Sequence, residues 1–217
     1  MRRAARAVAG VAAFALASML SFSSPARAQQ AGAGISGPTG LTLDLATMLK
    51  AKPGAWADYM MAGKGGEKPL TIRYSLLDRT AAKLTLEIGS ATPRGDMVVH
   101  FDFALQGRDA WKVVSGKVQI GDQKMDMPSA QLEAMPPLKT SDSPGELVGN
   151  EDLTTPIGPF PCKHYRRAIA EGGKGPSIDM WLSDKVSPTG LVKSTLDPMG
   201  VQMTLLATGT GAQSKLH

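Results

Sequence analysis

Alternation of apolar and more polar residues with a period of two is the feature that most constrains this chain. The clearest example places Met97, Val99, Phe101, Phe103 and Leu105 on one side of an extended segment, while the residues between them face the other way. Successive side chains of a β-strand point to opposite faces, so this pattern predicts a strand with one apolar face. That face must be covered, which favours a sheet packed against itself or against helices.

The same alternation recurs along most of the chain from Trp56 onward. It predicts an entry strand that includes Trp56 and Tyr59, and further strands near 70–76, 84–88, 111–120, 148–154, 160–168, 177–182, 190–196 and 201–207. A phase slip near Ser115-Gly116 moves the apolar face to Val114, Val118 and Ile120, which predicts a bulge or bend. Gly- and Pro-rich segments at 171–175 and 187–190 predict turns. We expect a mainly β (α+β) fold whose curved antiparallel sheet of about ten strands curls into a closed or partly open barrel.

Two short helices are predicted beside the strands. The segment Leu41–Lys50 places its apolar residues on one helical face and is stopped by Pro53-Gly54. Residues 129–135, which follow Pro128, have the length of one or two helical turns. One or two short helices are therefore expected to accompany the sheet.

The first 28 residues have the order of a bacterial secretory signal peptide. A basic start that includes Arg2 and Arg3 precedes an apolar stretch at 8–22, and Ala26-Arg27-Ala28 has the small residues of a cleavage site. The stretch is shorter than the ~20 apolar residues of a membrane span, and no other segment approaches that length. We predict a signal peptide at 1–28 with cleavage after Ala28, a flexible lead-in at 29–40 and a single domain at 41–217. The mature protein is expected in the periplasm or secreted, without a membrane span.

Removal of the signal peptide changes the charge of the chain. The whole sequence has 24 basic and 19 acidic side chains, and four of the arginines lie in the signal. The remaining 189 residues therefore have 20 basic and 19 acidic side chains, a net charge of +1. A nearly neutral protein without a basic run that is interleaved with aromatic residues has no electrostatic basis for binding nucleic acid.

Several motifs occur in a recognisable order. They are G-x-W-x-x-Y (Gly54, Trp56, Tyr59), G-x-F-x-C (Gly158, Phe160, Cys162), a W-x-S-D…P-x-G-L-V-K hairpin within Asp179–Lys193, and G-x-G-x-x-S at Gly209–Ser214. In this order the chain resembles a group of uncharacterised exported bacterial proteins that are related in fold to the lipoprotein carriers LolA and LolB. The resemblance covers most of 54–216 and implies an unclosed antiparallel half-barrel wrapped around helices. It also implies a concave face of the kind that holds acyl chains in the carriers.

Methionine is unusually frequent for a chain with so few aromatic residues. Ten methionines and nine aromatic residues follow the signal peptide. Because methionine adapts to ligands of varied shape, an apolar groove lined by it suits acyl chains or partner segments. The alternative is that methionine fills gaps in a core poor in aromatic residues. The candidate ligand-binding residues are Met97, Phe101, Phe103, Met125, Met127, Met180 and Met203.

Cys162 and His164 are two residues apart on one predicted strand and therefore share a face. With Met125 or Met127 they could form a soft site suited to Cu(I). The alternatives are that Cys162 is a small buried apolar residue with His164 near the rim, or that an exported lone thiol cross-links two chains. We expect no metal and no cofactor.

Catalytic constellations are weak in this sequence. His100 and Asp102 share the face opposite Phe101, a spacing that could orient an imidazole, although such a pair is more often a solvated strand face. Asp44 with Asp58, or Glu151 with Asp152, could supply paired carboxylates, but surface acids are common. The sequence contains no G-x-S-x-G nucleophile motif. We expect that the protein is not an enzyme.

Two functions therefore remain as expectations. In the first, an exported protein binds a lipid, another apolar ligand or a hydrophobic partner segment in the concave face, with the helix at 41–50 as a lid. In the second, the protein is a structural or interaction protein of the cell envelope with a packed core, no small-molecule ligand, and an edge strand that pairs with a partner.

Overall fold

The computed structural model describes residues 44–216 except for 64–67, 93–94, 141 and 170–175. The predicted signal peptide at 1–28, the lead-in at 29–40 and the turn at 171–175 lie outside the described residues.

The described residues form twelve strands and two short helices, which confirms the mainly β fold. Every strand pair is antiparallel, as expected for a chain of hairpins. The helices are α2 (Leu45–Met48) and α3 (Ser129–Glu133). The strands are β1 (Trp56–Ala62), β2 (Leu70–Arg79), β3 (Lys83–Thr92), β4 (Gly95–Gln106), β5 (Ala110–Ile120), β6 (Gln123–Asp126), β7 (Leu138–Lys139), β8 (Glu146–Thr155), β9 (Gly158–Ala168), β10 (Ser177–Leu182), β11 (Leu191–Asp197) and β12 (Val201–Gly209).

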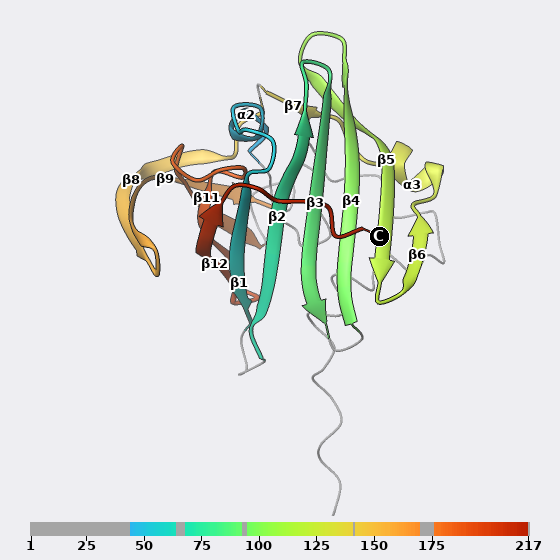
Figure 1. Cartoon of the computed structure of the whole chain (residues 1–217). Helices are drawn as coiled ribbons and strands as arrows, with labels where there is room; N and C mark the ends of the chain where they lie inside the picture. Colours follow the sequence, from blue (N-terminus) through green and yellow to red (C-terminus); the bar gives the residue numbers. More distant parts are fainter. Residues whose placement is uncertain (1–43, 64–67, 93–94, 141, 170–175, 217) are drawn as a thin grey trace, which may run out of the picture.

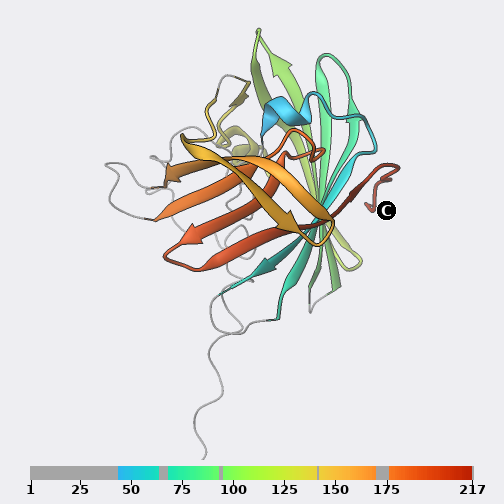
Figure 2. The same ribbon diagram turned by 90° about the vertical axis from the view of Figure 1, so that its left-hand side faces the viewer.

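All twelve strands belong to one sheet that does not close. Its order is β6-β5-β4-β3-β2-β1-β12-β11-β10-β9-β8, with β7 paired to β5 off this path. Figure 1 shows β2 to β5 side by side, and Figure 2 shows β10 to β12 running steeply across them, so the sheet is strongly curled. The two strands beyond the expected ten are β6 and β7, which have four and two residues and are too short to show alternation.

The alternation predicted from sequence separates the two faces of this sheet. On β3, Leu84, Leu86 and Ile88 are buried in the main core cluster, and we call their side of the sheet the inner face. Thr85 and Glu87 lie on the opposite, outer face. Because antiparallel partners in register share a face, the inner face continues across the neighbouring strands. On β4, for example, Phe101 pairs with Leu86 and Phe103 with Leu84.

The bulge expected near Ser115-Gly116 is present. Val113 pairs with Phe103 and Ser115 with Asp102, which leaves Val114 without a position in the register. The expectation that Val114 joins the apolar face is wrong, because its side chain is 50% exposed. As the extra residue of the bulge, it is turned away from the core.

The two helices pack against the sheet but are shorter than predicted. Within the described residues, the helix expected at 41–50 covers only 45–48, and its N-cap Asp44 accepts a hydrogen bond from the Ala46 N–H at 3.1 Å. Leu45 and Met48 are buried in the main core cluster. At the other helix, Leu132 of α3 lies against β5.

Gly209 at the end of β12 allows Trp56 of β1 to lie against the backbone. A Cβ atom at position 209 would be 2.5–2.9 Å from three atoms of the Trp56 indole, closer than real contacts allow. The indole also donates to the Thr210 carbonyl at 3.2 Å and lies 4.2 Å below the Arg73 guanidinium. These contacts hold the ring against the backbone of residue 209.

Gly209→Ala is therefore expected to displace Trp56 and to lower the free energy of unfolding by about 1–3 kcal/mol, as overpacking does elsewhere. Gly149→Ala is the control, because a Cβ there meets no atom within 4 Å. Urea unfolding followed by circular dichroism measures both variants. Equal stability of the two would contradict the packing role of Gly209.

Candidate functional site

Five of the seven candidate ligand-binding residues lie in strands and are buried on the inner face of the sheet. Met97, Phe101 and Phe103 follow one another at alternate positions of β4. Met180 of β10 and Met203 of β12 belong to the same core cluster. The inner face therefore brings together residues that are more than 100 positions apart in the sequence.

Met125 and Met127 lie on and directly after β6, the strand at the opposite end of the sheet from β8. Met125 pairs with Val118 across β5 and β6, and its side chain is 38% exposed. Met127 follows β6 and is buried over Gly116, where a Cβ atom would lie 2.5 Å from its Sδ. Met127 thus closes part of the core, whereas Met125 is at the rim.

The inner face runs continuously from the core to an exposed edge. Register pairs connect Met61 of β1 to Met203, then Ser194 of β11 and Met180. From Met180 the same row continues to Tyr165 of β9 and Leu147 of β8. Met180 and Met203 are fully buried, whereas Leu147 is 52% exposed. This row is therefore buried in its middle and exposed at its β8 end, on an edge strand whose residues are mostly exposed.

The structure supports the prediction that Cys162 is a small buried residue. Its side chain is 4% exposed, and its thiol donates to the Phe160 carbonyl at 3.3 Å. Burial is the main reason why the pKa of the Cys162 thiol is raised. A buried, protonated thiol is a poor nucleophile, metal ligand or partner for a disulfide between chains.

His164 does not join Cys162 in a metal site. Its Nε2 is 2.7 Å from Asp179 Oδ1, its Nδ1 is 3.3 Å from Glu151 Oε1, and its ring stacks on Trp181. Met125 and Met127, the two alternative soft ligands, lie on and directly after β6, at the far end of the strand order from β9. Among the residues that the structure describes, no group of three His, Cys, Asp or Glu side chains could hold a metal ion.

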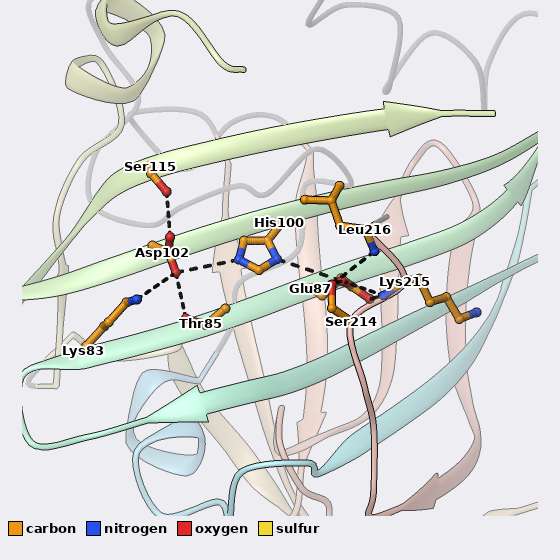
Figure 3. A network of polar contacts seen from close by, with 9 residues as sticks. All are labelled: Lys83, Thr85, Glu87, His100, Asp102, Ser115, Ser214, Lys215 and Leu216. Carbon is orange, nitrogen blue, oxygen red and sulfur yellow. Dashed lines mark hydrogen bonds and ion pairs between the residues drawn. The ribbon is translucent and has the colours of Figure 1, made fainter. Parts of the chain in front are cut away.

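His100 and Asp102 lie on the outer face of β4, as expected, but in a larger network that is shown in Figure 3. The ring lies between two carboxylates, with Nε2 3.7 Å from Asp102 Oδ1 and Nδ1 3.9 Å from Glu87 Oε2. Asp102 accepts hydrogen bonds from Thr85 and Ser115, both at 2.7 Å. Both hydroxyls thus donate to the Asp102 carboxylate, and neither is positioned as a nucleophile next to the imidazole.

Both carboxylates in this network are held in the charged form. Burial alone would raise the pKa of Glu87, but the nearby His100 ring and hydrogen bonds from Ser214 and the Lys215 backbone outweigh it and lower the pKa overall. The pKa of Asp102 is also lowered, because hydrogen bonds from Thr85 and Ser115 and the charge of Lys83 outweigh its burial. The network is therefore built around two anions.

The other carboxylate pairs considered from sequence are separated. Asp44 caps α2, whereas Asp58 forms a two-point ion pair with Arg73, in which both distances are 2.6 Å. Glu151 accepts a hydrogen bond from the N–H of the Trp181 indole. Glu151 and Asp152 are neighbours on one strand and therefore face opposite sides. Neither pair has two carboxyl groups directed at one point.

Sequence reasoning missed the role of the C-terminal residues 210–216, which we call the strap. Figure 1 shows the strap crossing the outer face in front of β1 to β4. It is attached through the Ala212 N–H to the Gly54 carbonyl at 2.9 Å. Beyond this point, Ser214 Oγ and the Lys215 N–H bind Glu87 at 2.7 and 3.0 Å. The strap explains why Glu87, which alternates with apolar residues like any outward-facing side chain, is only 3% exposed.

Alkylation of Cys162 is expected to be slow in the folded protein, because the thiol is buried and its pKa is raised. Iodoacetamide labelling followed by mass spectrometry should show modification only at denaturant concentrations that unfold the chain. Fast labelling under native conditions, or a disulfide-linked dimer on a non-reducing gel, would contradict the buried position.

Glu87→Gln is expected to loosen the strap, because the amide keeps only one acceptor oxygen and loses the charge that strengthens its hydrogen bonds. The variant should be less stable than the wild type by about 1–3 kcal/mol near pH 7. Because the folded-state pKa of Glu87 lies below its unfolded value of about 4.3, this contribution is present above that pH and is lost as the pH falls through the folded pKa.

The stability difference between wild type and Glu87→Gln, measured by urea unfolding from pH 7 to pH 3, should therefore shrink below about pH 4. Comparing the two proteins at each pH cancels the parallel titration of Asp102. A difference that stays constant over this range would show that the charge of Glu87 does not hold the strap.

Comparisons with known proteins add only limited information. Within the described residues, no helix is both long and apolar enough to cross a membrane. No protein-family model and no curated protein matches the chain. A hypothetical protein of Chlamydia trachomatis is 14% identical, with a TM-score of 0.49 over 78% of this chain and 93% of its own.

Two further solved structures are similar at the same low level. An exported protein of Bacteroides fragilis with a YmcC-like fold is 12% identical, with a TM-score of 0.39 over 74% of this chain and 97% of its own. A lipoprotein of Parabacteroides distasonis is 13% identical, with a TM-score of 0.39 over 73% of this chain and 96% of its own. None of the three names mentions LolA or LolB, so the relation to these carriers stays a prediction from sequence motifs.

Proposed function

We propose that this is an exported protein that holds a lipid, another apolar ligand or a hydrophobic partner segment against the inner face of its half-barrel. Export is supported by the order of basic, apolar and small residues at 1–28. The ligand would enter at the β8 end, where the inner face is open, and extend toward the methionines of β10 and β12.

The observation that carries this proposal is the apolar row that ends in solvent. It runs from the buried Met203 across the small buried Ser194 to Met180, passes Tyr165, and reaches the half-exposed Leu147. A large apolar side chain at the open end of a concave apolar surface is typical of the mouth of a binding site. Methionine at the inner end suits a ligand of variable shape, because its side chain has several accessible conformations.

The strength of such binding can be estimated from the buried ligand surface. Ten methylene groups at about 0.8 kcal/mol each contribute about 8 kcal/mol before the cost of ordering, which corresponds to a micromolar Kd at best. A carrier that must also release its ligand works in this range.

A second candidate, a structural or interaction protein with a filled core, is favoured by a different observation. Met180 is 1% exposed and Met203 is 2% exposed, so both already have tightly packed surroundings. A core filled to that extent needs no ligand for its stability. The two candidates differ in whether the purified protein binds an apolar molecule.

Binding of a fluorescent fatty acid, with displacement by palmitate, is the test that separates them. The purified protein, freed of lipid, should bind with a Kd in the micromolar range. Leu147→Asp should weaken binding about tenfold or more, because it places a charge at the apolar mouth. Ile157→Asp is the matched control, since Ile157 is also exposed but lies in the turn between β8 and β9.

Ile157→Asp is expected to bind like the wild type. Failure of the wild-type protein to bind any probe, together with an absence of bound lipid in native mass spectrometry, would favour the structural candidate instead. Equal weakening by both variants would show that the mouth is not at Leu147.

A further inference from the structure

The outer face contains a pocket that the inner-face proposal does not use. Its volume is about 230 Å³, and it lies over β1 to β4 beside the strap. The charged residues that line it are Asp58, Arg73, Asp96 and Lys215. The volume suits a small polar molecule and is too small for a long acyl chain.

Register pairs show how the pocket is built. Arg73 of β2 pairs with Gly89 of β3, and Asp96 of β4 pairs with Ala91 of β3. Gly89 and Ala91 therefore form the floor, with a cation on one neighbouring strand and an anion on the other. The backbones of β2 and β4 are about 10 Å apart, since each strand spacing is ~4.8 Å. Lys215 lines the same pocket from the strap.

Gly89 is the residue that keeps this space open. Glycine in the middle of a strand weakens it and usually marks a bulge, a tight bend or a close approach of another group. Here the backbone has no positive φ, and a Cβ atom at position 89 would meet nothing within 4 Å. Neither the conformation of the chain nor its own packing requires glycine at this position. The missing side chain leaves room for a ligand.

The charges around the floor define the ligand. Asp58 accepts hydrogen bonds from Nε and Nη2 of Arg73, which orients the guanidinium and leaves Nη1 as a donor to a ligand. The hydrogen bond from the Lys215 N–H to Glu87 fixes the Lys215 backbone on the same side, and Lys215 lines the pocket. Among the described residues, neither Lys215 nor Asp96 has an ion-pair partner.

From this arrangement we propose that the outer-face pocket binds a small zwitterion. Its phosphate or carboxylate group is bound by Arg73 and Lys215, and its ammonium group by Asp96. The strap completes the site, because without it the pocket loses one of its two cations.

Calorimetric titration of the purified protein with phosphoethanolamine and with β-alanine tests the proposal, since these probes carry the two kinds of anionic group. At least one should bind at concentrations up to about 10 mM, at which even a millimolar Kd is detected. Inorganic phosphate and ethanolamine, which each carry only one of the two charges, should bind more weakly. Absence of binding by both zwitterions, or equal binding by phosphate alone, would overturn the proposal.

Gly89→Val is expected to fill the pocket and to keep the fold, because β-branched residues suit strands and the new Cβ meets no atom within 4 Å. This variant should fold with an unchanged or higher Tm and lose binding. Gly149→Val is the matched control on β8, where a Cβ is equally free of contacts, and it should bind like the wild type. Retained binding by Gly89→Val would refute the site.

Lys215→Met and Asp96→Asn provide a second measurement that does not depend on filling the pocket. Methionine keeps the backbone N–H that binds Glu87, so the strap stays attached while the ammonium group is removed. Each variant should weaken zwitterion binding about two- to fivefold, the effect of one exposed ion pair. Unchanged affinity in both would mean that the charges do not recognise the ligand.

Discussion

Burial of one apolar sheet face is the constraint on which the rest of this structure depends. Each strand contributes alternate residues to the inner face, and the sheet curls until these residues are out of water. Leu84, Leu86 and Phe103 are almost fully buried in this way, although the helices α2 and α3 together have only nine residues. Each such side chain contributes about 1.5–3 kcal/mol when it leaves water, so the gain from curling is large.

The same alternation forces the intervening residues onto the outer face. There the protein places its charges in pairs across neighbouring strands, as with Asp58 and Arg73. Each of the two described histidines lies between two carboxylates: His100 between Glu87 and Asp102, and His164 between Glu151 and Asp179. These groups connect neighbouring strands laterally, and on β9 they do so beside apolar packing, since the His164 ring stacks on Trp181. The strap adds a connection from β12 to β3 across two intervening strands.

The two proposed sites lie on opposite faces of one sheet. The inner face is apolar and rich in methionine, whereas the outer pocket is polar, small and lined by charges of both signs. The sheet is the common scaffold, and the two proposed sites are separated by the thickness of its backbone.

Local patterns in the sequence were sufficient to predict all the strands except the short β6 and β7, the bulge in β5, the short helices and the inner-face position of residues such as Phe101 and Met180. These features depend on neighbours along the chain, and a period of two is visible without knowledge of pairing. The position of Val114 was mispredicted because a bulge removes one residue from the register, and the pattern does not show which one.

The sequence by itself determined which residues of each strand face the core and which face solvent, because alternation is a property of the extended backbone. Only the tertiary structure decided which outward-facing residues are covered, where the inner face stays open, and which charges meet. Glu87 and Ser214 are 127 positions apart, and their hydrogen bond exists only because the sheet brings β12 beside β1 and directs the strap across β3. The exposure of Leu147 and the open space above Gly89 likewise depend on long-range pairing, which no local pattern encodes.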